Sequence, residues 1–92
     1  MKLELRYERA FLRDMQRLNP ADYERAHRFL FEQFPQLRQL YQIPGLRQIS
    51  NHATYYRFPL GNHLVALEVT GQIVKFLRIV PKPNIPAESR QS

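Results

Sequence analysis

The sequence predicts a two-layer α+β domain, in which an N-terminal strand and a helical hairpin pack on an antiparallel sheet. Two observations predict this class. Apolar residues recur with a period of two at the N-terminus, with helical spacing over residues 8–34, and in short strand-like runs over residues 46–80. The 92 residues, 43% of them hydrophobic, suffice for one modest core but not for two. We therefore expect a single domain over residues 1–80 and a proline-containing extended tail over residues 81–92.

The N-terminal elements follow from the places where this period changes. Residues 2–7 (KLELRY) alternate apolar and charged side chains, as in a half-buried strand. Residues 8–18 show helical spacing, and a second helix is expected over residues 20–34, with Asn19 as its N-cap and Pro20 in its first turn. The apolar stripe of this second helix is expected to comprise Tyr23, His27, Leu30 and Phe34.

The C-terminal half is expected to form a loop followed by strands. Residues 36–45 (QLRQLYQIPG) have no clean period and predict a loop with room for one short helical turn. Strands are expected over residues 46–50, 54–60, 63–70 and 72–80, with glycine turns between the later ones. Such closely spaced turns predict an antiparallel meander. Pro59 cannot donate a ladder hydrogen bond, so its strand is expected to be an edge or to carry a bulge there.

Composition limits the classes of function. The formal net charge is +6, and most basic residues are arginine, whose planar guanidinium binds phosphate or carboxylate through paired hydrogen bonds. An anionic partner is therefore expected, either a nucleic acid or an acidic protein segment. The chain has no cysteine, no glycine-rich phosphate loop and no histidine pair at metal spacing, so neither a metal nor a cofactor is expected. No apolar run approaches membrane-spanning length, which predicts a cytoplasmic protein without a membrane partner.

Basic residues of the predicted strands form the first candidate site. Arg57 alternates with two aromatic residues and so points away from them, while Lys75 and Arg78 lie on opposite faces of the last strand. Lys82 follows that strand. If the helices cover one face of the sheet, Arg57, Lys82 and one of the last-strand cations are expected to meet on the other. With Tyr55 nearby they would bind phosphates and bases, and an ordinary solvated sheet face is the alternative.

A row of arginines in the first helix is the second candidate. Arg9, Arg13 and Arg17 recur every four residues and so share one side of the helix. Glu8 and Asp14 are near enough for pairing within the helix, which makes a solvated face one interpretation. The other interpretation is a docking strip for an acidic partner.

Three stretches of the chain point to a known family. They are YERAFLRDMQRL, LRQISNHATYYRFPLGNHLVALEV and FLRIVPKPNIP. In this order they resemble the first helix, the arginine-bearing strand with its glycine turn, and the last strand with its basic motif in the RelE/ParE superfamily, the toxins of type II toxin–antitoxin systems. Arg57 and Gly61 match family positions. Pro59 stands where a second basic residue is common, Leu64 where an arginine follows the turn, and Pro86 where a tyrosine closes the motif.

The resemblance implies a toxin that inhibits translation by cutting ribosome-bound mRNA and that binds a cognate antitoxin protein. In the mRNA-cutting members the RNA's own 2′-OH attacks the neighbouring phosphate, which needs an acid, a base and cations. Arg57 and Lys82 would then contact phosphate, with support from Arg78 and Lys75. His63 matches a family tyrosine, whose usual role is packing, and would otherwise serve as acid or base. The antitoxin would cover the helices and the sheet.

Two other functions stay open. A ParE-like toxin, which inhibits DNA gyrase, does without the nuclease residues and so tolerates Leu64 and Pro86. A relative without catalytic activity would bind RNA or protein, or associate with itself as a homodimer. The departures from the family pattern favour these alternatives, whereas Arg57 and Lys82 favour the nuclease.

Overall fold

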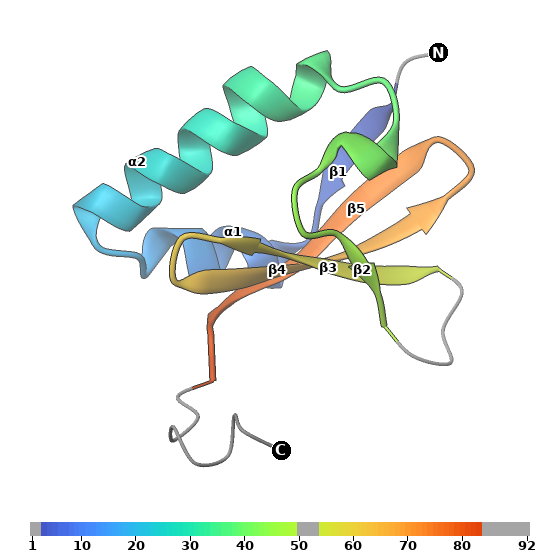
Figure 1. Cartoon of the computed structure of the whole chain (residues 1–92). Coiled ribbons are helices and arrows are strands. Elements are labelled where there is room, and N and C mark those ends of the chain that lie inside the picture. The colour runs from blue at the N-terminus through green and yellow to red at the C-terminus, as the bar shows by residue number, and fades with distance from the viewer. Residues whose placement is uncertain (1–2, 50–53, 84–92) are drawn as a thin grey trace.

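A computed structural model describes residues 3–49 and 54–83 and confirms the α+β class. Two helices, α1 (Arg9–Gln16) and α2 (Pro20–Arg28), accompany a five-stranded sheet. The strands are β1 (Glu4–Tyr7), β2 (Arg47–Gln48), β3 (Tyr55–Leu60), β4 (His63–Thr70) and β5 (Ile73–Pro81). Their order is β1-β5-β4-β3-β2, and α2 lies over one face of the sheet (Figure 1). In the described part of the chain, no helix is long and apolar enough to span a bilayer.

The sheet is mixed, which corrects the expectation of a wholly antiparallel one. Strands β2 to β5 form the predicted antiparallel meander. β1 instead pairs with β5 in parallel, with Tyr7 opposite Phe76. Both helices and three strands separate β1 from β5 in sequence, so no hairpin turn constrains their relative direction and tertiary packing sets it.

The second helix begins where its capping residues predict. The Asn19 side chain accepts a backbone N–H of the first turn at 2.8 Å, and Pro20 occupies the first helical position. Beyond α2 the helix continues as a π turn, Phe29–Gln33, and then as a 3-10 turn, Phe34–Gln36. A separate 3-10 turn, Leu40–Gln42, lies in the loop predicted over residues 36–45. The predicted start of the second helix and the predicted short turn in the loop are both confirmed.

The hydrophobic core lies between the helices and the sheet. Its buried residues are Phe11, Met15, Ala26, Leu30, Phe34, Ile43, Phe58, Val65, Leu67, Val74, Phe76 and Ile79. Of the predicted stripe on the second helix, Leu30 and Phe34 are buried, but Tyr23 and His27 are exposed. The sequence contains two rows of residues spaced by four, and packing on the sheet selects the row through Ala26 rather than the row through Tyr23.

Asp14 joins α1 to the edge of β5. β1 pairs with β5 only as far as Phe76, and within the described residues α1 lies along the rest of that edge. Asp14 is buried, and its Oδ2 accepts the Ile79 backbone N–H at 3.0 Å. The same carboxylate accepts Arg78 Nε at 2.6 Å and Arg78 Nη2 at 3.1 Å. The Arg78 hydrogen bond lowers the pKa of Asp14, against the opposing effect of burial and with help from the Ile79 N–H.

Candidate functional site

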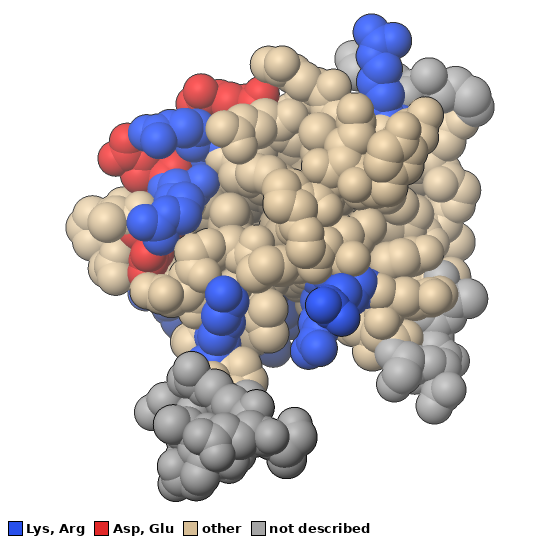
Figure 2. Space-filling model, viewed as in Figure 1, with Lys and Arg blue, Asp and Glu red and all other residues tan. Residues whose placement is uncertain are grey.

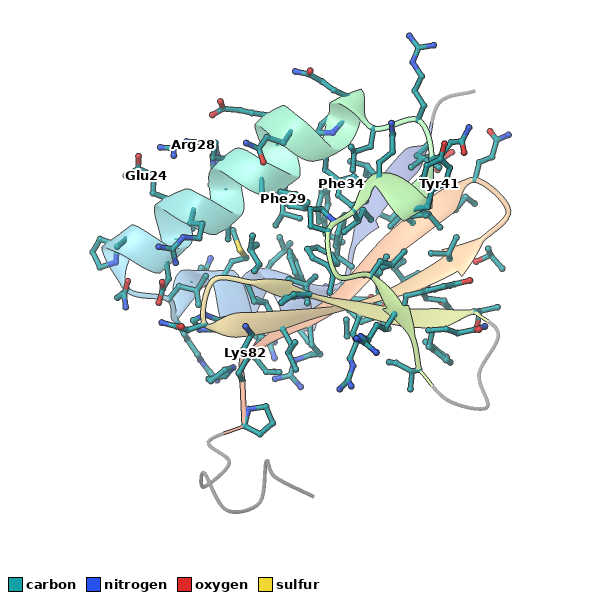
Figure 3. The ribbon with its side chains drawn as sticks, viewed as in Figure 1. Glu24, Arg28, Phe29, Phe34, Tyr41 and Lys82 are labelled. Carbon is teal, nitrogen blue, oxygen red and sulfur yellow. The ribbon has the colours of Figure 1, made fainter. Side chains whose placement is uncertain are left out.

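A groove on the open face of the sheet has three basic side chains in its wall. Its volume is about 470 Å³, and its lining residues are Gly45, Arg47, Arg57, Phe58, Pro59, Leu64, Lys82 and Pro83. Arg47 belongs to β2, Arg57 to β3, and Lys82 to the segment that follows β5. Figure 3 shows Lys82 on the side of the sheet opposite α2, where the chain leaves β5. Three segments distant in sequence therefore supply the cations of one groove.

Arg47 and Arg57 lie directly opposite each other on neighbouring antiparallel strands. At such positions the Cβ atoms are about 4.5–5.5 Å apart, and like charges repel each other. A second hollow, of about 360 Å³, adjoins the pair and is lined by Arg47, Gln48, Ile49 and Arg57. An anion between the two guanidinium groups would remove the repulsion, so this pair favours binding of phosphate or carboxylate.

Pro59 and Gly45 shape the groove beside the end of β2. β2 pairs with β3 only at Tyr56 and Arg57, so Pro59 lies beyond it, and the predicted edge position is confirmed. Gly45 has a φ of +74°, and a Cβ atom there would lie 2.6 Å from Pro59 Cδ. The loop backbone thus rests against the proline ring, an approach that glycine alone permits.

Backbone contacts hold Lys82 beside the turn between β3 and β4. Its N–H donates to the Asn62 carbonyl at 2.9 Å. Among the described residues, no carboxylate forms an ion pair with Arg47, Arg57 or Lys82. In Figure 2 the basic groups below the sheet have no acidic neighbour in view, whereas those at the upper left lie beside acidic ones. The positive charge of the groove is therefore uncompensated within the described chain.

The structure brings Arg57 and Lys82 together and places Arg78 in register with Arg57, on either side of Ala66, but both last-strand cations lie outside the groove. A bulge in the register between β4 and β5 puts Lys75 and Arg78 on the same face, which corrects the expectation of opposite faces. Lys75 lies opposite Glu68 in the register of β4 and β5, with 3.7 Å between Lys75 Nζ and Glu68 Oε1. It also lies 3.8 Å from a carboxylate oxygen of Glu8, far along the strand from the groove. Arg78 is held by Asp14. Both cations therefore have ion-pair partners, unlike the cations of the groove.

His63 also lies outside the groove. Neighbouring residues of a strand point to opposite faces, so His63 and Leu64 line different hollows. The His63 side chain lines a cleft of about 280 Å³ that it shares with Asp14 and Arg78. An acid–base role at the groove would need the imidazole on the other face of β4, and the structure does not place it there.

The row Arg9, Arg13 and Arg17 is exposed on α1. In the described residues none of the three forms an ion pair, so the solvated interpretation does not rest on pairing within the helix. Arg17 lines the same cleft as His63. Arg9 and Arg13, nearer the start of the helix, do not line this cleft, so the three arginines do not form one continuous surface.

An exposed aromatic row runs along the outer side of α2. Tyr23 and Phe31 are 42% and 44% exposed, and the ring centres of Tyr23 and His27 are 5.9 Å apart. The ring centres of His27 and Phe31 are 4.8 Å apart. Leu12 on α1 is 45% exposed. This apolar surface on the helices is a second candidate site, distinct from the groove.

Arg47 is the groove residue that sequence reasoning missed. It lies in the predicted strand over residues 46–50, but that strand had no assigned partner. The available signal was the register, since extending the meander back by one strand places Arg47 opposite Arg57.

No protein-family model matches the sequence, and no curated protein matches it. Among solved structures, a RelB–RelE antitoxin–toxin complex from Methanococcus jannaschii matches with a TM-score of 0.69 and 19% identity, covering 84% of this chain and 89% of that one. The RelBE2 toxin–antitoxin complex from Mycobacterium tuberculosis gives 0.71 and 14%, covering 89% and 100%. An archaeal RelE–RelB complex from Pyrococcus horikoshii gives 0.65 and 21%, covering 92% and 100%. The chain has a RelE-like fold.

The likeness to RelE extends over the domain that bears both candidate sites. It confirms the family resemblance that the sequence motifs suggest at the level of the fold. Identities of 14% to 21% do not transfer individual site residues.

Proposed function

We propose that this chain is the toxin of a type II toxin–antitoxin system and that it cleaves mRNA on the ribosome. The RelE-type fold supports the first part. The observation on which the second part depends is the groove, where three cations from separate segments lie without carboxylate partners among the described residues. Such a site suits a phosphate diester, which is negatively charged and becomes more so during cleavage.

In the proposed reaction the 2′-oxygen of one nucleotide attacks the adjacent phosphorus. The bond from phosphorus to the 5′-oxygen of the next nucleotide breaks, leaving a 2′,3′-cyclic phosphate and a 5′-oxygen that takes a proton from water to become a hydroxyl. Arg47 and Arg57 would bind the non-bridging oxygens, whose charge grows in the transition state. Lys82 would stabilise the leaving oxygen as a compact positive charge.

The groove has few groups that could transfer protons in this mechanism. Its lining residues include no histidine and no carboxylate. The proton of the 2′-hydroxyl would therefore pass to water or to a group of the ribosome. We accordingly expect cleavage to be much slower with free RNA than with ribosome-bound mRNA.

Induced expression with and without the adjacent reading frame tests this function. We expect growth arrest that the neighbouring gene relieves, together with ribosome-dependent mRNA cuts mapped by primer extension. Arg57→Ala should abolish the cuts. Arg28→Ala is the matched control, because Arg28 pairs with Glu24 on the exposed side of α2, at 2.6 Å. Growth arrest that persists in Arg57→Ala would overturn the nuclease.

The second candidate is a ParE-like inhibitor of DNA gyrase. Leu64 and Pro59 contribute apolar surface to the groove, which suits a protein partner better than a nucleic acid. Gyrase-linked DNA damage without mRNA cuts would identify this activity. Harmless overexpression would instead leave a non-catalytic module that binds RNA or protein, or itself.

An antitoxin would cover the helices, in this proposal. The row of Tyr23, His27 and Phe31 is apolar and exposed, and Arg9 and Arg13 add positive charge on α1. An amphipathic acidic segment fits both features, since its apolar side would bury the rings and its carboxylates would meet the arginines. Toxicity and neutralisation would then depend on different surfaces.

A further inference from the structure

The cleft beside the groove combines three basic side chains from different elements. Arg17 follows α1, His63 begins β4, and Arg78 lies in β5. Asp14 also lines this cleft, whose volume is about 280 Å³. The proposed cleavage mechanism does not use this cleft.

Asp14 orients Arg78 without blocking it. The carboxylate binds Arg78 through Nε and Nη2, so Nη1 takes no part in these bonds. The Arg78 side chain is 53% exposed even though it is held at 2.6 Å. Asp14 also accepts the Ile79 backbone N–H, so both carboxylate oxygens already bind groups of the protein. A guanidinium fixed in this way presents its remaining N–H groups to a ligand at little entropic cost.

Positive charge exceeds negative charge in this cleft. Asp14 offsets Arg78, and Arg17 adds a further positive charge that has no ion-pair partner among the described residues. The His63 ring can donate a hydrogen bond from either nitrogen, according to its tautomer. The cleft therefore suits a small anion with several oxygen acceptors, such as a phosphate group.

The cleft and the groove are neighbours. Val80 and Pro81 line the cleft, and the next residue, Lys82, lines the groove. On the adjoining strand His63 lines the cleft and Leu64 the groove. A strand of RNA that leaves the groove past Lys82 would therefore meet the cleft at Pro81 and Val80.

We propose that Arg17, His63 and the Asp14-oriented Arg78 bind a second phosphate of the same RNA strand, next to the one in the groove. This inference rests on the proposed function and adds a subsite to it. Arg17 and His63 are binding residues in this subsite, and Asp14 is a positioning residue that acts through Arg78.

Oligonucleotide binding by the full chain tests the subsite. The probes are a dinucleotide with one phosphate and a hexanucleotide, both 2′-deoxy so that no attacking hydroxyl is present. Fluorescence anisotropy at several salt concentrations gives the affinity and its salt dependence. For wild type we expect the longer probe to bind more tightly and with a steeper salt dependence, because each phosphate contact adds about 0.7 to the slope for single strands.

Arg17→Ala should remove about one such contact from the hexanucleotide and leave the dinucleotide unchanged. Arg38→Ala, an exposed arginine on the loop after α2, is the matched control and should change neither. Asp14→Asn should also reduce the advantage of the longer probe while the dinucleotide still binds, a separation that a general loss of folding would not produce. Equal losses in Arg17→Ala and Arg38→Ala would overturn the subsite.

Two controls separate this inference from the proposed function. Dinucleotide binding that Arg57→Ala leaves intact would count against the groove, whatever happens at the cleft. Titration with inorganic phosphate, followed through the His63 ring signals by NMR, tests the cleft alone. If phosphate shifts these signals but the longer probe gains nothing from Arg17, the cleft binds free phosphate only and the RNA subsite is wrong.

Discussion

At the scale of single residues, Asp14 shows how one carboxylate links local structure to a site. It occupies the place of a strand partner at the edge of β5 and at the same time fixes the direction of Arg78. The sequence suggests a different role, pairing within α1 to the nearby arginines. In the structure its bonds reach residues more than sixty positions away.

We predict that Asp14→Asn destabilises the protein at neutral pH by about 1–3 kcal/mol, because hydrogen bonds to a charged group are lost. The folded-state pKa of Asp14 is lowered from its ordinary value of 3.8, so its contribution is complete above that pH and is lost as the pH falls below it. Urea unfolding at pH 7 and pH 3 measures this. The gap between wild type and variant should narrow at pH 3, and a constant gap would contradict the assignment.

Gly45 offers a second test at this scale. Gly45→Ala should destabilise the protein by more than about 1 kcal/mol, because φ is positive and the new Cβ meets Pro59. Gly71→Ala is the matched control, since its φ is +60° but no atom lies within 4 Å of the added Cβ. Thermal unfolding should show the larger loss for Gly45→Ala. Equal losses would mean that the contact with Pro59 has no energetic role.

At the scale of elements, the second helix has two rows of large side chains and buries only one. Ala26, Leu30 and Phe34 pack into the core, where Phe34 meets Phe76 edge to face with ring centres 5.1 Å apart. The row through Tyr23 stays outside. α1 does not cover it, and it ends at Gln16, two residues before the predicted end at residue 18. The exposed row is therefore available to a partner.

We predict that the pair of changes Tyr23→Ser and Phe31→Ser prevents neutralisation by the antitoxin while toxicity persists. Both side chains are more than 40% exposed, so the variant should stay folded, and its main cost should be the contact of Phe31 with Tyr7, whose ring centres are 5.5 Å apart. Co-expression of the variant with the adjacent reading frame measures the effect. Phe34→Ser would be unsuitable as a control because it opens the core, whereas Tyr41→Ser, at 77% exposure, leaves the helices unchanged. Full neutralisation of the double variant would place the antitoxin elsewhere.

At the scale of the whole molecule, the charge is unevenly distributed. The net charge is +6, and ion pairs such as those of Arg25 and Arg28 neutralise much of the surface along α2. The groove cations have no such partners among the described residues. Long-range attraction should therefore guide an anionic ligand to the open face and to the arginines of α1 that are unpaired within the described residues, more strongly than to α2. In Figure 2 the basic groups below the sheet have no acidic neighbour in view.

We predict that RNA binding weakens with salt, with a slope of log affinity against log salt of about −1.4 for two phosphate contacts of a single strand, one in the groove and one in the cleft. Arg47→Ala should lower the affinity and reduce the magnitude of this slope, because the groove phosphate loses one of its cations. Arg28→Ala should leave the slope unchanged, because Arg28 already pairs with Glu24. Anisotropy titrations over a range of salt concentrations provide the measurement, and a slope that does not respond to Arg47 would remove this residue from the site.

The sequence by itself determined the elements of this fold and one half of its site. These features can be predicted because they depend on residues that are close together in the sequence. They are the alternating and helical spacings, the Asn19 cap and the glycine turns. Arg57 could be recognised because its strand alternates clearly.

Tertiary structure alone decided the rest. The parallel pairing of β1, the choice between the two rows on α2, and the meeting of Arg47 with Arg57 all depend on contacts between segments far apart in sequence. The same holds for the capture of Arg78 by Asp14, separated from it by 64 positions. The physical reason is that the spacing of residues along the chain determines which side of its own helix or strand a side chain occupies. The charge or surface that faces that side belongs to another element, which the spacing does not describe.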